Sequence, residues 1–148
     1  MMFLKHPKGK RTVGVLALDR KLWNIFSRYI RLRDSDHGLG KCITCGRYIP
    51  VKEGDAGHFR NRRHKSTRFM EENVAFQCPN CNRFDEGKAY EFGKALDVKY
   101  GEGMADKITK LSGVSSKLDR LWYESAIKEY KLKLSQLIAK KGDPWTRS

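Results

Sequence analysis

The sequence Cys42-Ile43-Thr44-Cys45 and its counterpart Cys78-Pro79-Asn80-Cys81 are the two stretches that decide the fold of this chain. Together they can present four thiolates in the tetrahedral arrangement that zinc prefers. In a reducing compartment this spacing favours a metal site over disulfides. We therefore expect Cys42, Cys45, Cys78 and Cys81 to bind a structural zinc ion (Zn²⁺). The alternative is that they are buried free thiols or a redox pair.

The composition narrows the partners that this protein can have. The chain has 148 residues, with 31 lysines and arginines against 17 acidic residues, which gives a net charge of +14. This length fits one compact domain with room for a helical extension. So large an excess of positive charge indicates a polyanionic partner, most often nucleic acid, with a membrane surface as the weaker alternative. The sequence has no run of 18 apolar residues and no signal-peptide core, so we expect no membrane span and a cytoplasmic location in a host cell.

Upstream of the first cysteine pair, the sequence has the pattern of one amphipathic helix. Apolar residues recur at helical spacing between residues 18 and 33 and form one face. The polar cluster Asp34-Ser35-Asp36-His37-Gly38 should end this helix. The predicted organisation is a basic N-terminal arm over 1–17, a zinc-containing domain with its leading helix over 18–101, and a C-terminal helical extension over 102–148.

Between the two cysteine pairs, the pattern changes to that of strands. The segments 48–51 and 55–58 predict a β-hairpin within 47–60, with its turn near Glu53 and Gly54. Residues 71–76 are expected to form a short turn, and a helix is predicted from about Asp85 to Tyr100, ended by Gly101. The segment 60–68 has five basic residues and no acidic one, which favours a phosphate-binding loop. These residues are Arg60, Arg62, Arg63, Lys65 and Arg68.

The last third of the chain is predicted to be helical. A short helix from Met104 should end at Gly113, and Ser116 with Asp119 should cap a long helix that runs to about Lys141. Two alternatives stay open for the apolar stripe of the long helix. It packs on the helix of residues 18–33, or it packs on a second copy of the chain in a homodimer. The stripe comprises Leu118, Leu121, Trp122, Ser125, Tyr130, Leu134, Leu137 and Ile138.

The order of the motifs resembles the HNH, or ββα-metal, nuclease motif in a form that has Asn82 in place of the final histidine. The words Asp-Ala-Gly-His-Phe at 55–59 and Gln-Cys-x-x-Cys-Asn-Arg at 77–83 are similar to those of the phage NinG/Rap recombination nucleases, over about residues 20–100. The resemblance implies an α+β protein, with a zinc-stapled ββα-metal nuclease core and flanking α-helices. It also implies a structure-specific endonuclease that cuts branched recombination intermediates such as Holliday junctions and D-loops.

The resemblance also implies roles for four polar residues. His58 would be the general base, because a histidine that titrates near pH 6.5 can accept a proton from water. Asn73 would orient that histidine or share in the metal shell. Asn82 and Asp55 would bind the catalytic metal, Mg²⁺ or Mn²⁺, because such ions prefer hard oxygen ligands.

Asp55 departs from the family pattern. Many ββα-metal nucleases have an acid directly before the catalytic histidine, whereas this sequence has Gly57 there. A regular strand would point Asp55 and His58 to opposite faces, so we expect a bulge at residues 56–57 to bring them together. Glu86 is a second acid that can approach the site.

Two other functions fit parts of the same pattern. A zinc-knuckle DNA-binding module without catalysis explains the charge and the cysteines, but it leaves His58, Asn73 and Asn82 without a role. An HNH nuclease that acts on linear duplex shares the site and differs only in its substrate. Cleavage of branched DNA is the function that we predict.

Overall fold

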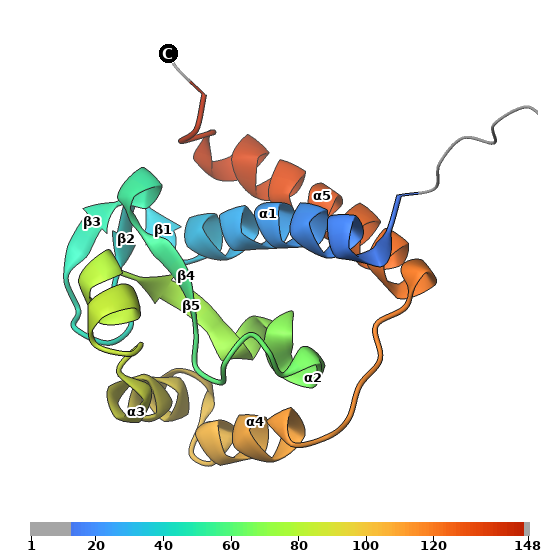
Figure 1. Ribbon diagram of the computed structural model, residues 1–148. Coiled ribbons are helices and arrows are strands. Elements are labelled where there is room, and N and C mark those ends of the chain that lie inside the picture. Colours follow the sequence, from blue (N-terminus) through green and yellow to red (C-terminus); the bar gives the residue numbers. More distant parts are fainter. Residues whose placement is uncertain (1–12, 147–148) are drawn as a thin grey trace, which may run out of the picture.

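The computed structural model describes residues 13–146, which form a mixed α+β fold with two small sheets (Figure 1). The α+β class is therefore as predicted. None of the helices in the described part of the chain is long and apolar enough to cross a membrane. The elements, in order, are α1 (Val15–Arg33), β1 (Ser35–Asp36), β2 (Leu39–Lys41), β3 (Tyr48–Pro50), η1 (Val51–Glu53), β4 (Asp55–His58), α2 (Lys65–Arg68), η2 (Glu71–Asn73), β5 (Val74–Gln77), η3 (Asn80–Phe84), α3 (Ala89–Tyr100), α4 (Met104–Ser112) and α5 (Arg120–Lys141).

Helices α1 and α5 lie side by side and enclose the main apolar core (Figure 1). The ring of Phe26 on α1 meets that of Tyr130 on α5 edge to face, with centroids 4.9 Å apart. At the far end, Lys141 donates hydrogen bonds to the carbonyl oxygens of Leu32, Arg33 and Ser35, where α1 ends. This basic side chain satisfies backbone carbonyls that a helix end otherwise leaves free.

The predicted helices are present, with differences in detail. α1 begins at Val15, inside the predicted arm, and residues 1–12 of that arm lie outside the described part of the chain. α4 has the predicted bounds. The cap of α5 is Asp119 and not Ser116, and its side chain accepts a hydrogen bond from the backbone N–H of Trp122 at 2.8 Å. The face that α5 buries is also rotated from the predicted stripe. Leu121 is 75% exposed, and the face against α1 comprises Tyr123, Ala126, Ile127 and Tyr130.

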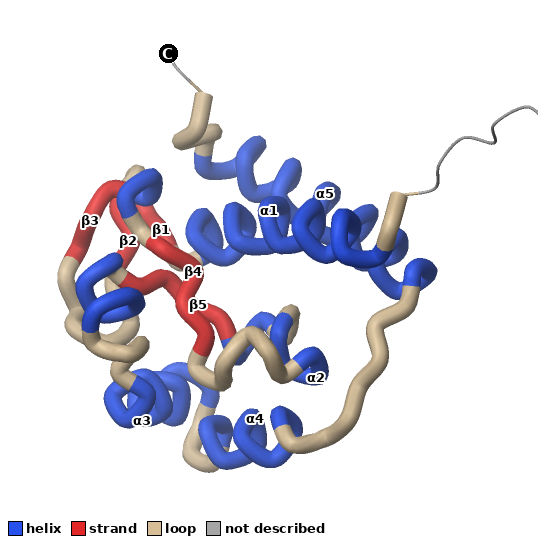
Figure 2. Tube along the Cα trace, viewed as in Figure 1, coloured by secondary structure: helices blue, strands red, loops and turns tan. Residues whose placement is uncertain are grey.

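The predicted hairpin over 47–60 is wrong. β3 pairs with β2 in a three-stranded sheet, whereas β4 pairs with β5 in a separate sheet, and the two are joined by the turn η1 (Figure 2). The turn predicted over residues 71–76 is confirmed for Glu71–Asn73, which form η2, but the chain then continues as β5 (Val74–Gln77), the partner of β4. That segment is a strand in which all four residues are buried, so it lacks the alternation of polar and apolar residues that would have indicated a strand.

The predicted bulge at residues 56–57 is also wrong. Each residue of β4 faces one residue of β5 in an unbroken antiparallel register, from Asp55 opposite Gln77 to His58 opposite Val74. Asp55 and His58 therefore do point to opposite faces of the sheet.

The helix predicted from residue 85 begins four residues later. After the second cysteine pair, η3 makes one wide π turn, in which the backbone N–H of Asp85 donates to the carbonyl of Asn80 at 3.2 Å. Positive φ angles at Glu86, Gly87 and Lys88 then break the helix before α3 starts. This break separates the residues directly after the cysteines from the rest of the helix, and π turns of this kind recur at functional sites.

Candidate functional site

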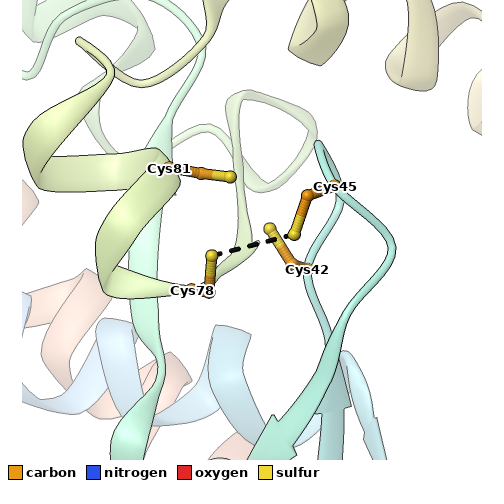
Figure 3. Close-up of side chains that lie close together, drawn as sticks. All are labelled: Cys42, Cys45, Cys78 and Cys81. Carbon is orange, nitrogen blue, oxygen red and sulfur yellow. Dashed lines mark hydrogen bonds between the residues drawn. The ribbon is translucent and has the colours of Figure 1, made fainter.

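The four cysteines form a cluster where β2 and β5 end (Figure 3). Their sulfur atoms all lie within 4.8 Å of one another, and the Sγ atoms of Cys45 and Cys78 are 3.8 Å apart. Four sulfurs bound to one tetrahedral zinc ion at about 2.3 Å lie about 3.8 Å apart. The donor set and its size therefore fit zinc, as predicted. Three of the cysteines are buried and Cys45 is exposed.

The surroundings of the cluster favour the thiolate, the form that binds metal, at Cys42, whereas burial raises the pKa of Cys45 and of Cys81. Burial raises the pKa of Cys42, but hydrogen bonds from the Thr44 hydroxyl and from backbone N–H groups outweigh it and lower the pKa to about 6. Lys88 lies close to the cluster, and the charge of Cys81 raises the pKa of its ammonium group.

A second site lies in a pocket of about 680 Å³ between α1, β4 and η3. Three of the four residues with a predicted catalytic or metal-binding role line it, namely Asp55, His58 and Asn82. The pocket does not need the expected bulge, because β4 is the edge strand of its sheet. Asp55 reaches the pocket on the side of η3, where it contacts Asn82, and His58 reaches it on the side of α1, where it contacts Trp23. The pocket thus spans the free edge of the strand and collects side chains from both faces.

His58 is held in one orientation by two contacts. Its Nε2 atom lies 2.9 Å from the carbonyl oxygen of Arg68, and its ring stacks on that of Trp23 with centroids 4.9 Å apart. The pKa of His58 is lowered to about 4, chiefly by burial, with a smaller contribution from the positive charges of Arg68 and Arg62, whereas the hydrogen bond to the Arg68 carbonyl acts to raise the pKa. The imidazole is therefore neutral near pH 7.

Asp55 is surrounded by hydrogen-bond donors from η3. The Nη2 and Nε atoms of Arg83 lie 2.7 and 2.9 Å from its two carboxylate oxygens, and Asn82 donates from Nδ2 to Oδ2 at 3.0 Å. This ion pair raises the pKa of Arg83. Glu86 also lines the pocket. The oxygens of Asp55 and Asn82 are hard donors of the kind that Mg²⁺ and Mn²⁺ prefer, so these side chains fit such an ion.

Asn73 is fully buried and lies outside the residues that line the pocket. Its Oδ1 accepts from the backbone N–H of Arg60 at 2.7 Å, and its Nδ2 donates to the carbonyls of Arg60 and Thr67. Asn73 therefore holds together the two ends of the segment 60–68, which we call the basic loop. The next carbonyl after Thr67 is that of Arg68, which accepts from His58, so Asn73 bears on the orientation of the histidine through the loop.

Some basic side chains of the loop are exposed to solvent, whereas others are bonded to groups of the protein. Arg62, Arg63 and Lys65 are exposed. Arg68 instead forms an ion pair with Asp19 at 2.7 Å, with only 15% of its side chain exposed, and Arg60 donates to the hydroxyl of Ser112. Of the five residues predicted to bind phosphate, only these three exposed ones have side chains that are free to do so in the described part of the chain.

Comparison with known protein families decides the relationship of this chain. The family model described as "Bacteriophage Lambda NinG protein" matches residues 15–140. The chain belongs to the NinG family. The match extends from α1 into α5, and it includes both cysteine pairs and every predicted pocket residue. A search of curated proteins and a search of solved structures gave no match.

The pocket of this NinG-family chain contains two arginines that the sequence patterns did not identify as site residues. Arg83 comes from η3 and Arg31 from α1. Burial lowers the pKa of Arg31, and its Nε donates to the carbonyl of Ser27 at 3.2 Å. Trp23, Ser27 and Arg31 are four residues apart along α1 and all line the pocket, so helical spacing was the signal that could have found Arg31.

Proposed function

We propose that this protein is a metal-dependent HNH-type endonuclease that cleaves the phosphodiester backbone of DNA at branched recombination intermediates, such as Holliday junctions and D-loops. One observation carries the proposal. Asp55, His58 and Asn82 meet in one pocket whose wall contains three arginines, in a chain of a phage protein family. The antiparallel pair β4–β5, followed by η3 with Asn82, has the order of a ββα-metal motif, which supports the HNH assignment.

His58 is the general base in this proposal. Its Nε2–H faces the Arg68 carbonyl, so the proton-free nitrogen of the neutral ring is Nδ1. That nitrogen can accept a proton from a water molecule as the water attacks phosphorus. Stacking on Trp23 fixes the plane of the ring during the transfer.

Asp55 and Asn82 are the residues that would hold a divalent ion, Mg²⁺ or Mn²⁺. When bound, such an ion neutralises charge on the phosphate and stabilises the leaving oxygen. The zinc site supports this arrangement from outside the pocket, because Cys81 directly precedes Asn82 in η3. Zinc bound to the four cysteines would therefore fix η3, the turn that places Asn82 beside Asp55.

Arginines supply the remaining positive charge that an anionic backbone requires. Arg31 of α1, Arg83 of η3 and Arg62 of the loop after β4 line the pocket together with its polar residues. Together with the exposed Arg63 and Lys65 they would follow the phosphates on either side of the cleaved bond.

One assay tests the proposal and separates it from the other candidates. A labelled four-way junction and a linear duplex of the same sequence are each incubated with zinc-loaded protein, in metal-depleted buffer and then with Mg²⁺ or Mn²⁺. We expect metal-dependent cleavage near the branch point, with much less cleavage of the duplex. Binding without cleavage under every condition would indicate a zinc-knuckle DNA-binding module, and equal cleavage of both DNAs would indicate a duplex nuclease.

A further inference from the structure

We infer that Arg83 competes with the divalent cation for Asp55, and that cation binding releases its guanidinium group to a phosphate of the bound DNA. This inference rests on the proposed function, because it requires that Asp55 binds the cation. It assigns to Arg83 a positioning role that joins metal binding to DNA binding.

The contact between Arg83 and Asp55 is bidentate. The guanidinium lies 2.7 Å from Oδ1 and 2.9 Å from Oδ2, so each carboxylate oxygen accepts one hydrogen bond from it. Asn82 adds a third hydrogen bond, to Oδ2. A carboxylate offers about four lone-pair positions, so these two residues use most of them.

A divalent cation at Asp55 has to share these oxygens with a positive charge. The guanidinium of Arg83 is the only ion-pair partner of Asp55 among residues 13–146. Two positive groups at the same carboxylate repel each other, most strongly in a pocket partly shielded from water. Asn82 presents its amide NH₂ group to Asp55, so its amide must also turn over before its oxygen can face the same cation.

Arg83 is the partner that is free to move. Its side chain is 62% exposed, whereas that of Asp55 is 16% exposed. Within the described residues the hydrogen bonds of the Arg83 side chain all go to Asp55, so its departure breaks no other hydrogen bond.

The released guanidinium has an anionic destination. Arg31 and Arg62 line the same pocket, which makes it a place for phosphate rather than for a further cation. A guanidinium matches the paired oxygens of a phosphate as well as it matches those of a carboxylate. Arg83 would therefore exchange one bidentate partner for another when metal and DNA bind together.

Calorimetric titration of the zinc-loaded full chain with Mn²⁺, without DNA, tests the competition. Arg83→Gln should bind Mn²⁺ about two- to fivefold more tightly than the wild type, the range expected when an exposed ion pair is removed. Arg62→Gln is the matched control, because it removes the same charge from the same pocket without an ion pair to Asp55, and its affinity should change less. Asp55→Asn should abolish this binding.

The outcomes separate the inference from the function on which it rests. If Asp55→Asn binds Mn²⁺ like the wild type, Asp55 is not a metal ligand and the proposed metal site fails. If Asp55→Asn abolishes binding while Arg83→Gln binds no more tightly than Arg62→Gln, the metal site stands and the competition is overturned.

A second measurement tests the transfer of Arg83 to phosphate. In a His58→Ala background, which should not cleave, Mn²⁺ should raise the affinity for a four-way junction, measured by fluorescence anisotropy. Adding Arg83→Gln should reduce that increase in affinity about twofold or more, the size expected for the removal of one exposed ion pair. An undiminished increase would overturn the transfer. Circular dichroism of each variant checks that the chain is folded.

Discussion

The Nε2 atom of His58 lies 2.9 Å from the carbonyl oxygen of Arg68, a residue ten positions further along the chain. Because a carbonyl can only accept, Nε2 carries the proton and Nδ1 is the basic nitrogen of the neutral ring. Asn73 clamps the loop before this carbonyl, through its hydrogen bond to Thr67. The orientation of the proposed base therefore depends on the loop between β4 and β5.

Replacement of His58 is the first test of this arrangement. His58→Ala should reduce the rate of junction cleavage by about 100-fold to 10,000-fold, the usual contribution of a general base. DNA affinity should stay close to that of the wild type, because binding comes from the cationic surface. Single-turnover cleavage and anisotropy measure the two effects separately. Cleavage by His58→Ala at close to the wild-type rate would show that this motif is not a nuclease site.

The lowered pKa of His58 predicts how stability depends on pH. Burial holds the pKa near 4, below its ordinary value of 6.5, so between these values the unfolded chain binds a proton that the folded chain excludes. The contribution of His58 to the free energy of unfolding is complete above about pH 6.5. About 2 kcal/mol of this contribution should be lost as the pH falls to about 5. Urea unfolding of the wild type and His58→Gln at both pH values measures it. Equal pH dependence of the two proteins would contradict the prediction.

The extent to which the sequence predicts this fold depends on how local each interaction is. The α1 helix follows from one apolar face, and the start of α5 follows from the polar residues before it to within a few positions, although its cap is Asp119 and not the predicted Ser116, because these signals lie within a few neighbouring residues. The hairpin failed because the partner of β4 is β5, which follows the basic loop. Two segments that are adjacent in sequence, β3 and β4, belong to different sheets, and no local pattern reveals that choice.

In the candidate site, too, the sequence predicted which residues take part but not which of their side chains contact one another. Motif spacing identified the cysteines, and the resemblance to a nuclease family pointed to Asp55, His58 and Asn82, which the structure brings into one pocket. The sequence did not reveal that Arg83 holds Asp55, since the direction of a side chain in a π turn differs from that in a regular helix. Nor did it separate Arg68, which is occupied by Asp19, from the exposed arginines of the same loop.

The zinc cluster predicts a strong link between metal and fold. Cys78 is buried where β5 ends, so Cys78→Ser should destabilise the sheet as well as the site. Metal binding in such sites contributes on the order of 10 kcal/mol to folding, so the variant should unfold at a much lower temperature. Elemental analysis should find one zinc ion per wild-type chain. Wild-type protein purified without chelators and containing no zinc would contradict the assignment.

The exposed residues of the basic loop predict a salt-dependent share of DNA binding. Arg62→Ala/Arg63→Ala should flatten the plot of log affinity against log salt by about 0.9 for each phosphate that the loop no longer binds. Arg68→Ala is the matched comparison from the same loop. Because its guanidinium is paired with Asp19, this variant should lower the free energy of unfolding and leave the salt slope nearly unchanged. An unchanged slope in the double variant would exclude this loop from the DNA surface.

Gly57, at the position where related motifs have an acid, predicts a steric constraint. A Cβ atom at this position would lie 1.9 Å from Oε1 of Gln77 and 3.1 Å from Oδ1 of Asn82. Gln77 is fully buried and cannot easily withdraw, because its Nε2 donates to Thr44 at 3.2 Å and to the carbonyl of Gly87 at 2.9 Å. A side chain at Gly57 would therefore push apart the zinc knuckle and the turn after η3.

Gly57→Ala should consequently lower the free energy of unfolding by about 1–3 kcal/mol, the cost of overpacking a filled interior. Gly14→Ala is the control, because a Cβ atom there meets nothing within 4 Å and its φ of −69° suits any residue. Urea unfolding measures both variants. Cleavage by Gly57→Ala should also fall, since the added Cβ atom would press directly on Oδ1 of Asn82. If the two variants unfold at the same urea concentration, the space beside Gly57 is not filled as described, and an acid could occupy it without a decrease in stability.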